Sequence, residues 1–209
     1  MKRNQYTLGK PISFKGNGLH SGIPVTITMR PAPAGSGIIF RRIDLTGAPE
    51  VPAKSEFVTN TLRATTLERG NAKVFTVEHI LSALFALRID NCILEMDAPE
   101  PPVADGGALT FSQMILEAGI VELEEQTDIL TLETSVAVYE DNKFITALPY
   151  DGLRITFTSI NPHPLLGTQM KDFTIDKETY IREIAPSRTI GFTWELEACL
   201  LYTSPSPRD

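Results

Sequence analysis

The chain has 209 residues, of which 42% are hydrophobic and 22% charged, enough for one large globular domain or two small ones. Its formal net charge is −7, which argues against a nucleic-acid-binding protein because such proteins usually present a basic face to the phosphates. A small anionic substrate is still compatible with this charge, since a few lysine or arginine side chains can bind a diphosphate locally.

The first third of the chain predicts β-strands. Residues 6–14 and 24–29 alternate apolar and polar side chains, and residues 16–22 between them, GNGLHSG, predict a turn. Residues 37–42 predict another short strand. Residues 51–67 are rich in threonine and alanine without a helical stripe, so we expect strands and connections there.

The first predicted helix begins at Thr76, which is a suitable N-cap. In TVEHILSALFAL the apolar side chains recur every three or four residues, and no charge lies between His79 and Arg88. A surface helix normally carries charged side chains on one face. We therefore expect this helix to be covered on both sides, as a layer between two other layers.

The remaining pattern predicts a strand, a loop, a second helix and then a new run of strands. We expect strands at residues 91–96, 129–139, 144–149, 153–160 and 169–175, a loop at 98–107, and helices at 109–118 and 177–184. Gly119 is expected to end the helix at 109–118. The acidic residues 122–128, ELEEQTD, are interpreted as a connection between domains.

A β-rich stretch followed by helix, strand and helix occurs once and then begins again. This order predicts an α+β fold of two related βα halves with helices sandwiched between sheets, the second half incomplete. We expect a first domain at residues 1–126 and a partial second domain at 127–200. Residues 201–209, LYTSPSPRD, have no apolar period and are interpreted as a non-native tail or, alternatively, a disordered terminus.

The sequence also bears on cellular location. No stretch approaches the roughly 18 uninterrupted apolar residues of a membrane span, and the basic start is not followed by the apolar segment of a secretory signal. Cys92 and Cys199 are far apart and form no CxxC pair, so neither a disulfide framework nor a thiolate zinc site is expected. We expect a cytoplasmic protein in which Cys92 is a small core residue.

The strongest candidates for catalytic or metal-binding residues are Glu78 and His79, in the first turn of the predicted helix. The partial positive charge at a helix N-terminus favours a carboxylate there, and a glutamate beside a metal-bound histidine can act as general base. A histidine at a helix start is nevertheless more often a capping residue, and catalytic zinc needs three protein ligands. From these two residues alone, the metal site and the structural interpretation both remain open.

Other marked positions have weaker signals. His20 and His163 are each interpreted as loop residues rather than ligands. Asp105, in DGG, is expected to bond nearby backbone amides. The glycines of GNGLHSG are not followed by a helix and so form no phosphate-binding fingerprint. Thr189, in SRTIGF, fits the start of a strand, or a hydroxyl that donates to an oxyanion.

Six segments occur together in one order: GNGLHSG, TVEHILSAL, IDN, PEPPVADGGA, HPLLGTQ and SRTIGF. In this the chain resembles the UDP-3-O-acyl-N-acetylglucosamine deacetylases of lipid A biosynthesis in Gram-negative bacteria, from residue 5 to about residue 198. The overall sequence is similar to that of the form fused to a 3-hydroxyacyl-carrier-protein dehydratase. The resemblance implies a two-half fold with the active site at the junction.

The resemblance also implies residue roles. His79 matches a zinc (Zn²⁺) ligand of the family and Glu78 its general base. Thr189 matches a threonine that helps to hold the oxyanion. The implied substrate-binding positions are Leu62 and Arg63 at the approach to the metal, Lys143 near the UDP portion, and Ile190.

Two departures from the family pattern limit these roles. No HxxxD occurs in the chain, so the family's other zinc ligands, a histidine and an aspartate, are expected beyond its end. Asn161 and Pro162 occupy a stretch where many members carry an aromatic residue for the uracil ring, and Ile190 stands where an aromatic residue is common.

We therefore expect a zinc-dependent hydrolase that removes the N-acetyl group from UDP-3-O-acyl-N-acetylglucosamine, as a monomer unless it is fused to a dehydratase. The 209-residue chain by itself is expected to be inactive. The alternatives are a non-catalytic sugar-nucleotide-binding module, in which Glu78 and His79 only cap a helix, and a purely structural α+β domain.

Overall fold

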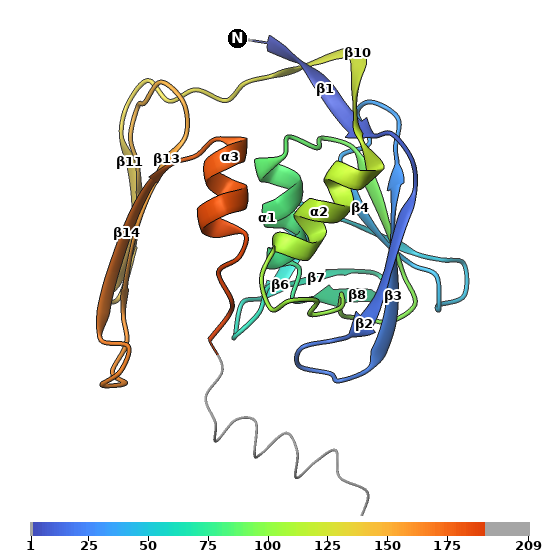
Figure 1. The fold of residues 1–209 in the computed structure, drawn as a ribbon, viewed down its shortest axis with the longest axis horizontal. Helices are drawn as coiled ribbons and strands as arrows, with labels where there is room; N and C mark the ends of the chain where they lie inside the picture. Colours follow the sequence, from blue (N-terminus) through green and yellow to red (C-terminus); the bar gives the residue numbers. More distant parts are fainter. Residues whose placement is uncertain (1, 191–209) are drawn as a thin grey trace, which may run out of the picture.

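The computed structural model describes residues 2–190 and contains a five-stranded mixed sheet of order β2-β3-β9-β4-β5 (Figure 1). Its strands are β2 (Ile12–Asn17), β3 (Pro24–Pro31), β4 (Ile38–Arg42), β5 (Glu50–Pro52) and β9 (Cys92–Met96). β4 and β9 run parallel, and the other neighbours antiparallel. The strands predicted at 24–29, 37–42 and 91–96 are confirmed. The alternation at residues 6–14 spans two strands rather than one, because the chain turns at Gly9, whose N–H donates to the Gly119 carbonyl.

A smaller three-stranded sheet lies beside the first helix. It consists of β6 (Val58–Asn60), β7 (Thr66–Arg69) and β8 (Ala72–Phe75), and a short 3₁₀ turn at Ser55–Phe57 precedes it. The expectation of strands and connections at residues 51–67 is confirmed. β8 leads within two residues into the helix, so this sheet sets the position of the helix start.

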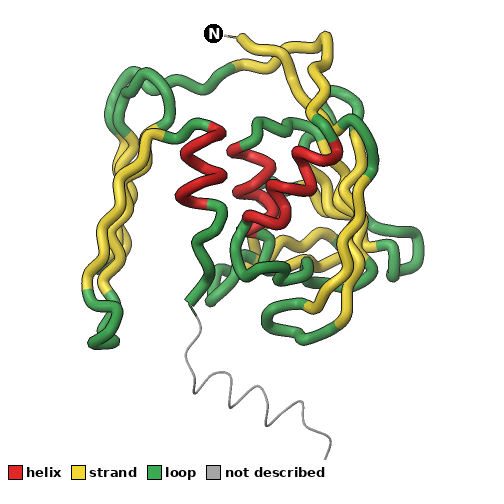
Figure 2. The backbone as a smooth tube through the Cα atoms, viewed as in Figure 1, coloured by secondary structure: helices red, strands yellow, loops and turns green. Residues whose placement is uncertain are grey.

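Two helices, α1 (Glu78–Ala86) and α2 (Leu109–Ala118), pack together beside the five-stranded sheet (Figures 1 and 2). One shared apolar core joins them to the sheet; it includes Ile80, Leu84, Phe111 and Ile115 from the helices and Ile27, Phe40 and Leu94 from the strands. Each such fully buried side chain contributes roughly 1.5–3 kcal/mol. Gly119, with φ +78°, ends α2 as predicted.

Four strands and a short helix follow. The strands form two separate hairpins, β11 (Val136–Glu140) with β12 (Lys143–Ala147), and β13 (Arg154–Ile160) with β14 (Thr168–Thr174). α3 (Lys177–Thr179) continues as a turn of π-helix, η2 (Tyr180–Ile184), as expected for residues 177–184. The α+β class is thus confirmed, while the domain bounds at 126 and 200 stay predictions. Residues 191–209, including the predicted tail, lie outside the described residues.

The helices lie as a layer between the first sheet and the two hairpins (Figure 1). One side of α1 is buried in the core, and on another side its Ser82 Oγ lies 2.8 Å from the hydroxyl of the buried Tyr180 of η2. Phe85 is nevertheless 69% exposed. The prediction that α1 is covered on both sides therefore holds only in part among the residues that the structure describes.

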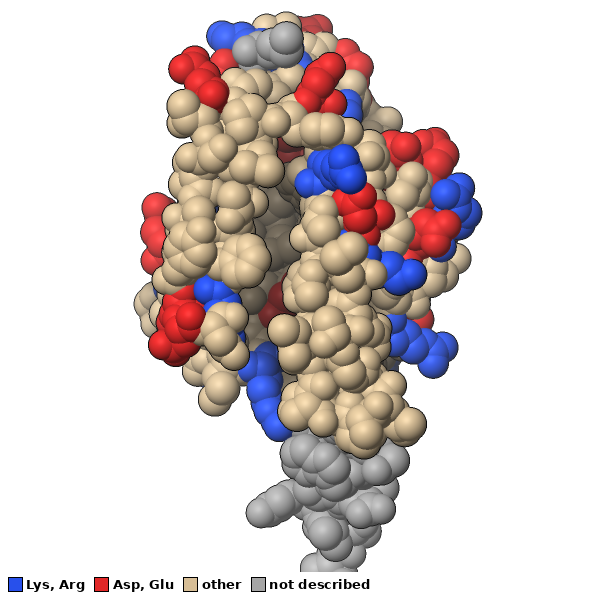
Figure 3. Space-filling model, turned by 90° about the vertical axis from the view of Figure 1, so that its left-hand side faces the viewer, with Lys and Arg blue, Asp and Glu red and all other residues tan. Residues whose placement is uncertain are grey.

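The hairpins expose much apolar surface. Their exposed apolar side chains include Val138, Phe144, Ile145, Phe157, Ile160 and Met170. Figure 3 looks onto this side of the molecule and shows a largely uncharged surface hollowed along its length. Contiguous exposed apolar side chains of this kind are typical of surfaces that contact another molecule or another part of a protein.

Residues 122–128, interpreted as a connection between domains, form a strand and not an irregular linker. They belong to β10 (Ile120–Asp128), which pairs antiparallel with β1 (Lys2–Leu8) from Lys2 opposite Asp128 to Leu8 opposite Ile120. The strand is largely exposed, so it can carry acidic side chains on both faces without a desolvation cost.

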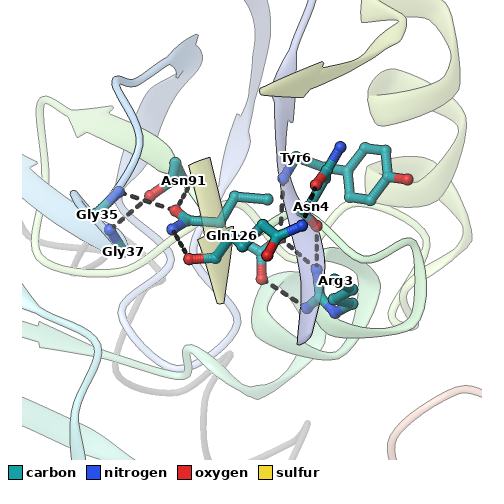
Figure 4. A network of polar contacts seen from close by, with 9 residues as sticks. Arg3, Asn4, Tyr6, Gly35, Gly37, Asn91 and Gln126 are labelled. Carbon is teal, nitrogen blue, oxygen red and sulfur yellow. Dashed lines mark hydrogen bonds and ion pairs between the residues drawn. The ribbon is translucent and has the colours of Figure 1, made fainter. Parts of the chain in front are cut away.

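The IDN segment fastens β1 to the body of the protein (Figure 4). Asp90 accepts two hydrogen bonds of 2.7 Å from the Arg3 guanidinium and one from the Tyr6 N–H. The Asn91 side chain donates to Gln5 and accepts from the Gly37 N–H. Asp90 raises the pKa of Arg3 through the hydrogen bond it accepts.

Cys92 is fully buried in β9, as expected for a small core residue. Burial raises the pKa of its thiol to about 12, so the sulfur stays protonated and unreactive at neutral pH. No helix within residues 2–190 is both long and apolar enough to cross a membrane.

Candidate functional site

Glu78 and His79 are the first two residues of α1, at the end of the helix that β8 leads into. The Glu78 side chain is exposed and accepts a hydrogen bond from the backbone N–H of Thr65. His79 is half-buried. Ile80, Ala83 and Leu84 anchor the helix in the core, while the Glu78 carboxylate stays in contact with solvent.

Thr76 is not the N-cap that the sequence suggested. The N-cap position is Val77, and no side chain caps α1 there. Thr76 instead adopts φ +57°, a left-handed conformation that is unusual for a β-branched residue, and its Oγ1 donates to Glu100 at 2.7 Å. Its hydroxyl therefore faces a buried carboxylate rather than the first turn of the helix.

Glu100 is the buried carboxylate beneath this site, with no exposed surface. Besides Thr76, it accepts hydrogen bonds from the N–H of His20, at 3.0 and 3.2 Å, and from the N–H and hydroxyl of Ser21, at 2.8 and 2.7 Å. Gly18 lies so close that an added Cβ would stand 2.3 Å from the carboxylate. The turn at 16–22 thus wraps around Glu100, and the sequence alone gave no indication of this.

A hollow of about 260 Å³ opens beside the helix start. Its lining residues are His20, Leu62, Arg63, Ala64, Thr66, Lys73 and Phe75. Leu62 is 82% exposed, and Arg63 has φ +62°. The next residues of this loop include Thr65, which donates to Glu78, so the structure brings Leu62 and Arg63 to the vicinity of Glu78. Two of the lining residues, Arg63 and Lys73, are cationic.

Thr189 lies against the DGG turn. Its N–H donates to the Gly106 carbonyl at 2.9 Å, and Asp105 accepts from the N–H of Thr110, as expected for an aspartate in a turn. A Cβ on Gly107 would stand 2.7 Å from the Ala185 carbonyl. Gly107 therefore allows the segment that carries Thr189 to approach the turn closely.

The other predicted positions lie apart from this group. Lys143 begins β12, in a hairpin that is not hydrogen-bonded to the first sheet. Ile190 is exposed, and no described contact joins Thr189 or Ile190 to Glu78. His163 is a loop residue whose Nδ1 accepts from the Leu165 N–H at 3.2 Å.

The described residues do not complete a metal site. Within residues 2–190, no three histidine, cysteine, aspartate or glutamate side chains are grouped closely enough to hold a metal ion. His79 offers one imidazole and Glu78 a neighbouring carboxylate, whereas a catalytic zinc site uses three protein ligands.

The comparison with protein families decides the relationship. The model of the family LpxC, UDP-3-O-acyl N-acetylglycosamine deacetylase, matches residues 5–201. The chain belongs to this family. The resemblance carried by the ordered sequence segments is thereby confirmed.

Curated members of this LpxC family are similar along most of the chain. A bifunctional enzyme LpxC/FabZ from Chlorobaculum tepidum is 43% identical over 198 residues, which cover 93% of this chain and 42% of that protein. UDP-3-O-acyl-N-acetylglucosamine deacetylases from Geotalea uraniireducens and Legionella pneumophila are 38% and 41% identical, over 95% and 92% of this chain. The chain spans 64% of the length of each of these two relatives.

Proposed function

We propose that the protein is a hydrolase that removes the N-acetyl group from UDP-3-O-acyl-N-acetylglucosamine. The observation that carries the proposal is the pair Glu78 and His79 at the start of α1, beside a hollow lined by Leu62 and Arg63. Membership of the LpxC family and the names of the relatives support the choice of substrate.

In the proposed reaction, Glu78 accepts a proton from the water that attacks the acetamido carbonyl carbon. The exposure of Glu78 gives water access to its carboxylate, and a positioned general base contributes about 10²–10⁴-fold to a rate. The hydroxyl of Thr189 donates to the oxyanion. When the C–N bond breaks, the proton that Glu78 accepted passes to the departing amine, and the acetic acid that leaves gives up its own proton to water as acetate.

Substrate binding is assigned to the loop and hairpin residues. Leu62 and Arg63 line the approach to Glu78, Lys143 is proposed to bind the UDP portion through its ammonium group, and Ile190 contacts the substrate beside Thr189. The cationic side chains of Arg63 and Lys73 around the hollow fit an anionic substrate.

Zinc is part of the proposal, with His79 as one ligand. Residues 2–190 do not supply a complete site, so the further ligands are proposed to come from other parts of the protein. We expect the 209-residue chain to lose added zinc on dialysis and to be inactive by itself. Elemental analysis finding about one zinc per dialysed chain would contradict this expectation.

Catalysis is tested by the substitution Glu78→Gln in the whole protein. This substitution keeps the shape of the side chain and removes the base. We expect the release of acetate to fall by at least about 100-fold. Glu117→Gln is a matched control, because Glu117 is an exposed glutamate of the neighbouring helix α2. Unchanged turnover in Glu78→Gln would contradict the assignment, and a wild-type protein that binds the sugar nucleotide without turnover would favour the binding module.

A further inference from the structure

The carboxylate of Glu100 joins two segments that are distant in sequence. Oε1 accepts from the Thr76 hydroxyl and the His20 N–H, and Oε2 accepts from the N–H and hydroxyl of Ser21. A carboxylate has about four acceptor positions, so these donors use its full capacity. One fully buried side chain thus fixes both the loop that carries His20 and the residue two positions before Glu78.

Thr76 needs this support. A β-branched residue with φ +57° is strained by about 1–3 kcal/mol unless its surroundings hold it in place. The hydroxyl is held by Glu100, and the Thr76 N–H donates to the Thr65 carbonyl at 3.1 Å. Thr65 in turn donates its own N–H to Glu78. A continuous series of hydrogen bonds therefore runs from Glu100 through Thr76 and Thr65 to the Glu78 carboxylate.

We propose that Glu100 is a positioning residue for the candidate site, which holds the start of α1 through Thr76 and the loop at His20 in one fixed arrangement. The inference rests on the proposed function of Glu78 and His79. Glu100 lies beneath the site with no exposed surface, so it acts through other residues and not on the substrate.

Stability alone is a weak reason for this carboxylate. Burying an ionisable group carries a desolvation penalty, and well-packed apolar side chains often give equal or greater stability. What the carboxylate provides is directional contact with defined donors at two places that flank the candidate site.

The test compares two changes at Thr76. Thr76→Val keeps the branched shape and removes the hydroxyl, whereas Thr76→Ser keeps the hydroxyl. In Thr76→Val we expect hydrogen exchange at the Thr65 amide to accelerate by at least about tenfold, with exchange at the buried Leu94 of β9 changed less than about twofold. Thr76→Ser should stay within about twofold of wild type at both amides.

Thr7→Val is the matched control. It removes another buried threonine hydroxyl, which donates to the Asn91 carbonyl at 2.8 Å, away from Glu100. In Thr7→Val, the rate of hydrogen exchange at the Thr65 amide, relative to the rate at the Leu94 amide, should equal the wild-type ratio. Glu100→Gln, which puts an amide N–H₂ among the donors, should reproduce the effect of Thr76→Val. Equal acceleration at Thr65 and Leu94, or none at Thr65 in Thr76→Val, would overturn the inference.

Kinetics on the whole protein separate this inference from the proposed function. A misplaced base should lower kcat of deacetylation in Thr76→Val by about 10- to 100-fold with KM changed less than about twofold, and Thr76→Ser should restore it. An unchanged kcat in Thr76→Val would overturn positioning. If wild type released no acetate while the exchange pattern held, deacetylation would be wrong and the fixing of the helix start by Glu100 would stand.

Discussion

At the scale of single residues, two glutamates near the start of α1 differ in the burial of their side chains. Glu78 is exposed, while Glu100 has no exposed surface and accepts hydrogen bonds from His20, Ser21 and Thr76. A group that takes a proton from water must be accessible, whereas a group that holds the backbone benefits from a dry environment, where hydrogen bonds are stronger. The difference in burial thus fits the two roles proposed for these residues.

The sequence could indicate only part of this site. Glu78 and His79 are adjacent in the chain and open a strongly periodic helix, so local pattern was sufficient to propose them. Glu100 lies in a loop between prolines, and its partners are 80, 79 and 24 residues away. Local periodicity carries no information on such contacts, which is also why Thr76 was wrongly predicted to cap the helix.

The buried Arg42 gives a prediction about pH. It donates to both oxygens of Asp44, at 2.8 and 2.7 Å, and these hydrogen bonds lower the pKa of the Asp44 carboxyl below its ordinary value. Because the folded pKa is depressed, the pair stabilises the protein above the ordinary pKa of about 4, and this contribution is lost as the pH falls through the folded value.

We expect Asp44→Asn to lower the free energy of unfolding by about 1 kcal/mol at pH 7. The gap in this free energy between wild type and variant should narrow at pH 3. Urea unfolding at the two pH values measures it. Asp151→Asn, in an exposed loop, is the control and should show no gap at either pH. A gap of the same size at both pH values would contradict the prediction.

At the scale of elements, β10 shows the limit of composition as a guide. ELEEQTD has the acidic, exposed character of a linker, yet it forms a strand because β1 pairs antiparallel with it, with one irregularity between Asn4 and Tyr6. Neither strand has an apolar face wide enough to show a clear alternation. The strands and helices with one buried face were predicted correctly, since burial imposes the period that the sequence displays.

The pairing of β1 with β10 can be tested through Tyr6. Its hydroxyl donates to Glu122 at 3.0 Å, and this hydrogen bond raises the pKa of Tyr6. We expect the pKa of Tyr6 to fall toward the ordinary tyrosine value in Glu122→Ala, measured by NMR titration of the ring. Glu124→Ala, an exposed glutamate on the same strand, should leave it unchanged. Equal titration curves for Tyr6 in wild type and Glu122→Ala would show that the strands are not paired in this register.

At the scale of the whole molecule, the described residues form a well-packed part and a thinly packed part. The five-stranded sheet, α1 and α2 share one core, whereas the two hairpins are not hydrogen-bonded to that sheet and expose apolar side chains. The backbone of the hairpins lies on the far side of the helices from the sheet (Figure 2). The sequence predicted both sets of strands, although the first hairpin strand begins at Val136 and not at the predicted residue 129. It did not predict the difference in packing, because alternation in a strand reports a potential apolar face and not whether that face is covered.

Limited proteolysis of the 209-residue chain should reveal the difference. We expect the first cuts between residues 129 and 135, which are mostly exposed and form no strand, and a resistant core that ends near residue 128. Mass spectrometry of the fragments locates the cuts. A single resistant species that extends through the hairpins would contradict this picture.

The large sequence separation between Glu100 and its hydrogen-bond partners also has a consequence for biosynthesis. During translation, Thr76, Glu78 and His79 leave the ribosome before Glu100, and the loop at His20 leaves much earlier still. The helix can form as soon as its own residues are free, but its first turn cannot be fixed until the chain has grown past residue 100 and closed a loop of 80 residues onto His20. A nascent chain interrupted shortly before that point would carry both candidate functional side chains and still lack the contact that aligns them.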